Sequence, residues 1–407
     1  MIQSFKVFIC VALLSGLFSF SAMGREGSDE LAPEIPTSDL QISLGKTPVL
    51  DKAFMDASPA ERKGTVPVGR LGVDGGNKDM IVKLATEIAE TTYGRYDSLL
   101  IAHKGKLLFE SYYQRGRINL SHGQASATKA YLNLAIGRAI QLGHLTMSDL
   151  DKPLISFFKD LDTSKMVAGA EKITLHNAMT MSSGIKIDRE KWDEWVKSNP
   201  DSFKGSGQVQ AFLKHSEPIT SQSQIFEYKP FDPWLVIQVL DAVVPGSAKD
   251  FIKNELLNKL GITNYGWATG ISGLPEGPYG SRMTSRDMIK WGTLVMNQGK
   301  WKGEQLISEA FISKATHKVA EPDDVFFLAE NVTNPGYGYY WWQADLKVGD
   351  KTYFSTSAQG GGGQYIILIE ELDLIVVATG HYLAEDPDRP MTALQLTAER
   401  ILPAFIK

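Results

Sequence analysis

The sequence predicts an α+β protein in which an antiparallel sheet is flanked by terminal helices and interrupted by an inserted, mainly helical lobe. A helix and a hairpin open the folded part, helical segments fill the middle, and a strand meander with a final helix closes the chain. Segregated runs of strands and helices are typical of α+β folds. The simplest assembly joins both ends of the chain in one sheet, with the helical lobe at about 146–280. It leaves a cleft between sheet and lobe, the kind of place where ligands preferentially bind.

Each element follows from its pattern of apolar residues. Residues 78–93 repeat apolar side chains at helical spacing and stop before Gly94, which predicts a helix. Residues 98–113 are expected to form two strands around a turn at Lys104-Gly105. The other predicted elements are a helix over 127–142, a helix from Thr284 to about Asn297, strands over 339–345, 352–357, 364–369 and 374–379, and a closing helix over 391–406.

Composition excludes several classes of protein. The 407 residues are 43% hydrophobic and 22% charged, which is ordinary for a globular protein with a large core. The net charge of −5 offers no basic surface for nucleic acid, so no such partner is expected. Cys10 is the single cysteine, which excludes a disulfide framework and a cysteine zinc site. The seven histidines are scattered, and we expect neither a metal nor a cofactor.

The first 24 residues are predicted to be a secretory signal peptide. Lys6 precedes a mostly apolar run over 7–20, and Ala22-Met-Gly24 provides a small-x-small cleavage site. The run falls short of the roughly 20 residues that span a bilayer, so no stable membrane anchor is expected after cleavage. We therefore expect a periplasmic or secreted protein with an extended lead-in over 25–76 and one catalytic domain over 77–407.

The pattern Ser-x-x-Lys is the main candidate for chemistry. It occurs four times, at Ser43/Lys46, Ser126/Lys129, Ser156/Lys159 and Ser183/Lys186. Only Ser126 opens a long helix, and that helix is apolar except for one stripe that holds Ser126, Lys129 and Asn133. Such a stripe is expected to face a cavity.

A serine hydroxyl needs a base to become a nucleophile. A lysine amine serves as one when burial lowers its pKa, and one helical turn places the Lys129 amine near Ser126. The helix N-terminus also offers backbone N–H groups to a developing oxyanion. The alternative from the sequence alone is that Ser126 caps the helix and Lys129 is solvated.

Several stretches, taken in chain order, resemble the serine β-lactamase-like superfamily. This group includes class C β-lactamases, D-Ala-D-Ala peptidases, related esterases and 6-aminohexanoate-dimer hydrolases. The stretches are Ser126-Ala-Thr-Lys129 with the following 143–151, Ile173–Ile185 (ITLHNAMTMSSGI), Phe226–Asp232 (FEYKPFD), Gly280–Asp287 (GSRMTSRD) and Gly360–Gln364 (GGGGQ). The resemblance runs from about Asp97 to the C-terminus and implies a β-lactamase/transpeptidase-like fold.

The resemblance also implies roles for particular residues. Ser126 would attack a carbonyl and form an acyl-enzyme. Lys129 and Tyr228 would exchange the proton, with the phenolate of Tyr228 favoured by the nearby lysine. The backbone N–H groups of Ser126 and Gln364 would form an oxyanion hole. Gly361 and Asp232 are the further positions assigned to the oxyanion and substrate region.

Two positions depart from the family pattern. Pro230 stands where the second motif often has Asn, and Gly361 stands where the third motif often has Lys or His. The spacing Tyr228…Asp232 is similar to that of the esterase and aminohexanoate-oligomer hydrolase branch. Aromatic residues near the third motif either wall an apolar acyl pocket or belong to the core of the sheet; they are Tyr337, Tyr339, Tyr340, Trp341 and Trp342.

We therefore expect a secreted serine hydrolase that forms an acyl-enzyme with a small-molecule ester or amide. The alternatives are a β-lactamase or D-Ala-D-Ala peptidase, and a non-catalytic binding protein that keeps the fold, which Pro230 and Gly361 would suit. The sequence carries no signal for an oligomeric state or for one particular substrate.

Overall fold

The computed structural model describes residues 31–40, 42–322, 325, 327–382 and 391–406. The predicted signal peptide over 1–24 lies outside these residues. Among the described residues, no helix has the length and apolar character needed to cross a membrane.

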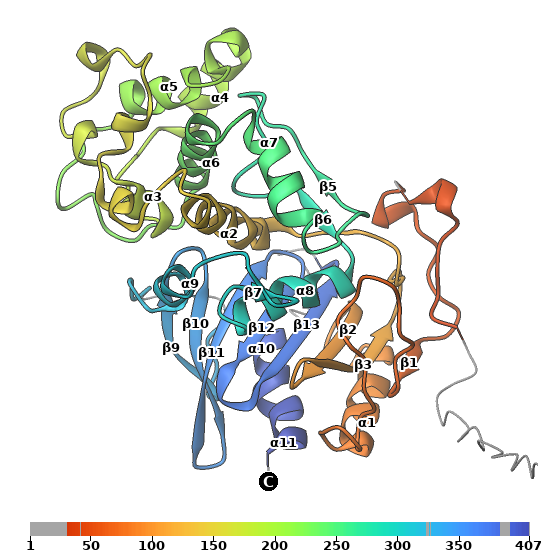
Figure 1. Ribbon diagram of the computed structural model, residues 1–407. Coiled ribbons are helices and arrows are strands. Elements are labelled where there is room, and N and C mark those ends of the chain that lie inside the picture. Colours follow the sequence, from red (N-terminus) through yellow and green to blue (C-terminus); the bar gives the residue numbers. More distant parts are fainter. Residues whose placement is uncertain (1–30, 41, 323–324, 326, 383–390, 407) are drawn as a thin grey trace, which may run out of the picture.

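An eight-stranded antiparallel sheet forms the centre of the molecule (Figure 1). Its order is β1-β3-β2-β13-β12-β11-β10-β9, so strands from both ends of the chain meet where β2 pairs with β13. The strands are β1 (Phe54–Asp56), β2 (Tyr96–His103), β3 (Lys106–Tyr112), β9 (Val332–Tyr337), β10 (Trp342–Val348), β11 (Lys351–Gly360), β12 (Gln364–Ile369) and β13 (Leu374–Gly380). The α+β fold class and the joining of the two ends are confirmed.

The sheet differs from the prediction at its two edges. Strand β1 lies inside the stretch that we expected to be an extended lead-in, and it pairs with β3. With three residues, it is too short to show an alternating pattern. The strand expected over 339–345 begins only at Trp342, because Tyr340 adopts a left-handed φ of 64° and Gly338 N–H bonds to Trp341 O across a tight turn. The preceding residues instead supply β9.

Helices cover both faces of the sheet (Figure 1). Helix α8 (Ser285–Met296) packs on β12 and β13 at Gly292, where a Cβ would come within 2.9 Å of Ile375. Helix α1 (Lys78–Ala89) and the C-terminal helices cover the other face. The predicted closing helix is present as α10 (Ala393–Leu396), a π-helical turn over Thr397–Ile401, and α11 (Leu402–Phe405).

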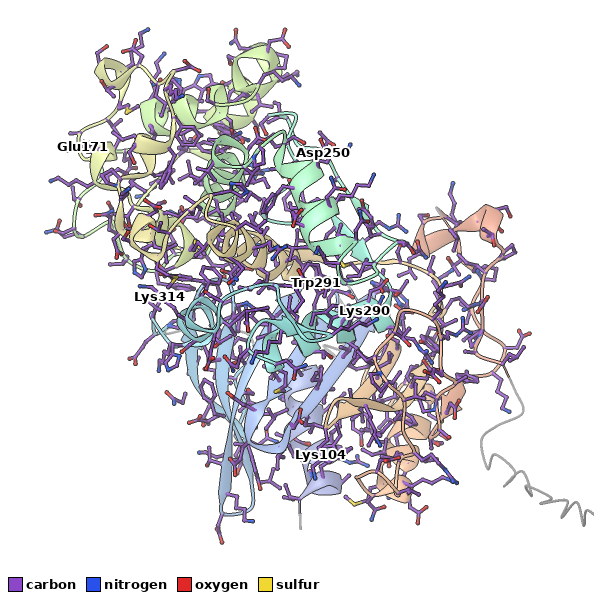
Figure 2. All side chains as sticks on the ribbon, viewed as in Figure 1. Lys104, Glu171, Asp250, Lys290, Trp291 and Lys314 are labelled. Atoms are coloured by element: carbon purple, nitrogen blue, oxygen red, sulfur yellow. The ribbon has the colours of Figure 1, made fainter. Side chains whose placement is uncertain are left out.

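The helical lobe lies above the sheet in Figure 1. Helix α2 (Thr128–Gln141) runs along its base, and Tyr131 of α2 stacks on Trp291 of α8 with ring centroids 4.9 Å apart; Figure 2 labels Trp291 at this junction. The other helices are α3 (Leu175–Met179), α4 (Arg189–Ser198), α5 (Gly207–His215), α6 (Phe231–Val243), α7 (Ala248–Phe251) and α9 (Glu309–Thr316). There are two further small sheets among the described residues. One has the strand order β4 (His122–Gly123), β6 (Ser281–Met283), β5 (Gly266–Trp267), and the other pairs β7 (Lys300–Trp301) with β8 (Glu304–Gln305).

Candidate active site

Ser126 lies in a 3-10 turn, Ala125–Ala127, directly before helix α2. The preceding Ala125 has a φ of 43°, a left-handed conformation that a residue with a Cβ adopts only at a cost. Ala127 takes the N-cap position of α2. Ser126 is therefore not the cap of this helix, and the purely structural alternative for this residue is not realised.

Lys129 is buried, with 3% of its surface exposed, and faces Ser126. Its Nζ lies 2.9 Å from Ser126 Oγ and 2.8 Å from the carbonyl oxygen of Pro278. Within the described part of the chain, the amine has no carboxylate partner. Burial without a counter-ion lowers the pKa of Lys129 to about 7, because desolvation penalises the ammonium form.

Tyr228 completes a three-residue cluster. Its hydroxyl hydrogen-bonds Ser126, and its ring centroid lies 4.8 Å from Lys129 Nζ. The residue is 40% exposed, yet the hydroxyl is turned inward to Ser126, and desolvation there raises the pKa of Tyr228 to about 12. This rise disfavours the phenolate that the family resemblance implies. The physical reason is that the nearby lysine is itself close to neutral and gives the phenolate little stabilisation.

The third motif approaches the Ser126 turn through Gly360. A Cβ on Gly360 would lie 2.1 Å from the carbonyl oxygen of Gln124, so only glycine fits at the end of β11. Gln364 pairs with Gly360 in the β11–β12 ladder and is buried, and its Nε2 donates to Gly380 O at 2.7 Å. Gly361 is exposed, and nothing lies within 4 Å of the place a Cβ would occupy. The motif thus leaves open space beside Gly361.

Asp232 lies in the first turn of α6 and is buried. Its Oδ2 accepts a hydrogen bond of 3.4 Å from Ser183 N–H. Desolvation raises the pKa of Asp232 to about 7, opposed by hydrogen bonds from Ser183. These contacts join α6 to the loop after α3. Asp232 therefore links the second motif to this loop, and its assignment to the oxyanion and substrate region stays a prediction.

The aromatic residues near the third motif divide into two groups. Tyr337 and Trp342 pack against Tyr228, with ring centroids 6.1 and 5.4 Å away. The other three are core residues: Tyr340 O–H donates to Ala178 O, Tyr339 hydrogen-bonds His176, and Trp341 is fully buried. Tyr337 and Trp342 are buried as well, so all five residues belong to the core, and a role of these rings as the wall of an acyl pocket stays a prediction.

Two parts of the site were not predicted from the sequence. One is Pro278 O, which accepts the Lys129 hydrogen bond; a backbone carbonyl carries no side-chain signal. The other is a buried carboxylate, Asp97, whose Oδ2 lies 3.0 Å from His122 Nε2 and 2.8 Å from His381 Nδ1. Gly380, next to His381, accepts the Gln364 hydrogen bond, so this cluster lies behind the third motif. Among the described residues, no group of three or more His, Cys, Asp or Glu could hold a metal ion.

The chain is similar to known proteins over most of its length. The beta-lactamase family model matches residues 95–398. A putative beta-lactamase from Bacteroides dorei has 16% identity and a TM-score of 0.63, covering 80% of this chain and 98% of that one. A putative 6-aminohexanoate-dimer hydrolase from Bacillus anthracis has 18% identity and a TM-score of 0.56, covering 72% and 75%.

A third structure, the octameric penicillin-binding protein homologue from Pyrococcus abyssi, has 18% identity and a TM-score of 0.58, covering 80% of this chain and 77% of that one. No curated protein sequence matches the chain significantly. At these identities the structures establish the fold, and the family model establishes the family. The chain belongs to the beta-lactamase family.

Proposed function

We propose that the protein is a serine hydrolase that cleaves a small, uncharged ester or amide through an acyl-enzyme on Ser126. The observation that carries the proposal is the buried amine of Lys129, 2.9 Å from Ser126 Oγ and without a carboxylate partner in the described structure. With a pKa near 7, a large fraction of Lys129 is unprotonated at neutral pH. A base whose pKa lies near the working pH is the most effective kind.

In the first step Lys129 removes the hydroxyl proton of Ser126 while Oγ bonds to the substrate carbonyl carbon. The hydrogen bond to Pro278 O holds the amine in place, which leaves its lone pair for the serine. Tyr228, protonated because its pKa is about 12, then passes its hydroxyl proton to the leaving alcohol or amine. Water then attacks the acyl-enzyme and gives a proton to the Tyr228 phenolate, while the Lys129 ammonium returns its proton to Ser126 Oγ as the acid product leaves.

Two backbone N–H groups stabilise the oxyanion in this proposal, one at the start of α2 and one in the turn after β11. Ser126 provides one donor, at the start of α2. The turn after Gly360 provides the other, with Gln364 and Gly361 as the two candidates, and Gly361 is the one next to open space. A donor of this kind typically contributes about 3–4 kcal/mol to the transition state.

The substrate is expected to lack a carboxylate at the position that faces the third motif. Residues 358–364 carry no charged side chain, and Lys229 is ion-paired with Glu227. Instead, the surroundings are aromatic: Tyr279 is exposed next to Pro278, and Trp342 packs on Tyr228. An apolar or aromatic acyl group suits such a surface. We further propose that the protein acts in the periplasm or outside the cell, on the basis of its N-terminal signal pattern.

Labelling with a fluorophosphonate probe and turnover of p-nitrophenyl butyrate test this proposal. Both are expected in the wild type and should vanish in Ser126→Ala. Ser156→Ala is the matched control, because it removes the serine of another Ser-x-x-Lys pattern, and it should behave as wild type. Undiminished labelling of Ser126→Ala would refute the assignment.

The same wild-type and variant proteins distinguish the alternative functions. Rapid nitrocefin turnover or a stable penicilloyl adduct on Ser126, without ester turnover, would identify a β-lactamase or a D-Ala-D-Ala peptidase. Binding of cell-wall fragments by a wild type that takes no fluorophosphonate label would identify a non-catalytic binding protein.

A further inference from the structure

A cavity lies in the helical lobe, apart from the Ser126 cluster. It has a volume of about 430 Å³, within the range of small-molecule sites. One wall is the α7 segment with the π-helical turn Ile252–Leu257 that follows it, and the other is the stretch 263–269, which contains β5. Figure 1 shows α7 next to β5, and Figure 2 labels Asp250 on α7. None of the three proposed catalytic residues lines this cavity.

The floor of the cavity is apolar and its sides are aromatic. Ile252 and Leu257 are buried beneath it, and Tyr265 and Trp267 line the opposite wall. The Trp267 indole donates to Glu276 O at 2.8 Å, which fixes the orientation of the ring. A flat apolar body is therefore the shape that this wall accommodates best.

The open side of the cavity is positively charged. Lys249 and Lys253 lie one helical turn apart, are exposed, and have no ion pair within the described part of the chain. The carboxylates of the same segment are engaged elsewhere: Asp250 hydrogen-bonds Ser247, and Glu255 pairs with Arg138 at 2.8 Å. Two ammonium groups without an ion pair in the described structure thus line a cavity whose other side chains are apolar or aromatic, apart from two threonines, Thr263 and Thr269.

We propose that this cavity is a binding site for an aromatic carboxylate, whose ring lies along Tyr265 and Trp267 and whose carboxylate meets Lys249 and Lys253. The π-helical turn supports the assignment, since π turns inside helices occur frequently at functional sites. It places Lys253 and Leu257 on the same wall, so the charged rim and the apolar floor belong to one continuous surface.

Calorimetric titration with 2-naphthoate and with the uncharged 2-naphthamide tests the site. We expect saturable binding of 2-naphthoate to the wild type and weaker binding of the amide. Lys249→Gln/Lys253→Gln should reduce naphthoate affinity about tenfold, the sum of two exposed ion pairs, and leave the amide unchanged. Tyr265→Ala should weaken both ligands.

The control Lys347→Gln/Lys351→Gln makes the same change in net charge on the β10–β11 hairpin and should bind as wild type. Ser126→Ala should also bind as wild type, so this site and the proposed catalytic one can fail separately. The proposal is overturned by absence of saturable binding to the wild type at millimolar 2-naphthoate. Equal affinities of the two double variants, or loss of binding in Ser126→Ala, would overturn it as well.

Discussion

Two buried lysines in this molecule have different partners. Lys129 on α2 and Lys290 on α8 are each 3% exposed, and each Nζ donates to a backbone carbonyl at 2.8 Å. Lys290, labelled in Figure 2, also forms a 2.7 Å ion pair with Asp287, one turn earlier on its helix. The residue one turn before Lys129 is Ser126, and the Lys129 amine contacts its hydroxyl instead of a carboxylate.

This comparison indicates that the side chain paired with a buried lysine governs whether its amine is stabilised in the charged form. A carboxylate offsets the cost of burying the ammonium group, whereas a hydroxyl does not, so burial shifts Lys129 toward the neutral amine. Burial also raises the pKa of Asp287, and the ion pair with Lys290 opposes that rise. We therefore expect Lys290 to be structural, and the proposed function assigns the role of the base to Lys129.

The largest expected effect is on activity, in Lys129→Met. The side chain keeps its apolar length but loses the base, so ester turnover per folded molecule should fall about 10³-fold. The free energy of unfolding should stay the same or rise, since a desolvated amine is removed. Steady-state kinetics and urea unfolding measure both; a fall in activity below tenfold would contradict the role of Lys129.

Lys290→Met should show the opposite pattern. It leaves Asp287 buried without its partner, which typically costs about 3–5 kcal/mol of stability. Activity per folded molecule should change little. Urea unfolding measures the loss, and the double variant Asp287→Asn/Lys290→Met should recover much of it. If Lys290→Met were as stable as wild type, the distinction between the two lysines would fail.

Tyr228→Phe sharpens the account of the catalytic cluster. It removes the hydroxyl that hydrogen-bonds Ser126 and leaves Lys129 as base, so turnover should fall about 10²-fold. The effect should be greater for esters with poor leaving groups, which need the proton more. Comparison of p-nitrophenyl and alkyl esters measures this, and an equal loss for both would argue against proton transfer by Tyr228.

A smaller effect, on the free energy of unfolding, is expected for substitution of Asp97. This buried carboxylate hydrogen-bonds His122 and His381. Burial alone would raise the pKa of Asp97, but hydrogen bonds from His122 and His381 outweigh it, and the pKa is lowered. The ionised form therefore contributes stability above the ordinary value of 3.8, and this is lost as pH falls through the lower folded value. Asp97→Asn should cost about 1.5–3 kcal/mol at pH 7. Its difference from wild type should shrink below pH 4 in urea unfolding; a constant difference would contradict this.

The sequence predicted most of the fold, because its elements are long enough to show a period. The hairpin of β2 and β3, helix α2 and the strands β11 to β13 all carry clear apolar patterns. The three-residue β1 and the turn at Tyr340 depend on pairing and backbone conformation instead.

The candidate site was predictable where its residues are close in sequence. Ser126 and Lys129 are three residues apart, on the 3-10 turn and on the helix α2 that continues it, so their contact follows from helical spacing. The position of Tyr228 came only from the family resemblance. The contact of Lys129 with Pro278 O spans 149 residues, and that of Asp97 with His381 spans 284, so both depend on tertiary packing. The neutral state of Tyr228 depends on local desolvation, which a motif does not encode.

The most direct test of the central claim is the titration of the lysine side chains by NMR in protein labelled with ¹³C-lysine. The Lys129 signal, assigned by its absence in Lys129→Met, should titrate with a midpoint near pH 7, as the pKa of about 7 requires. A Lys129 midpoint near pH 10 would contradict the account, since the amine would then be charged at neutral pH and unable to activate Ser126.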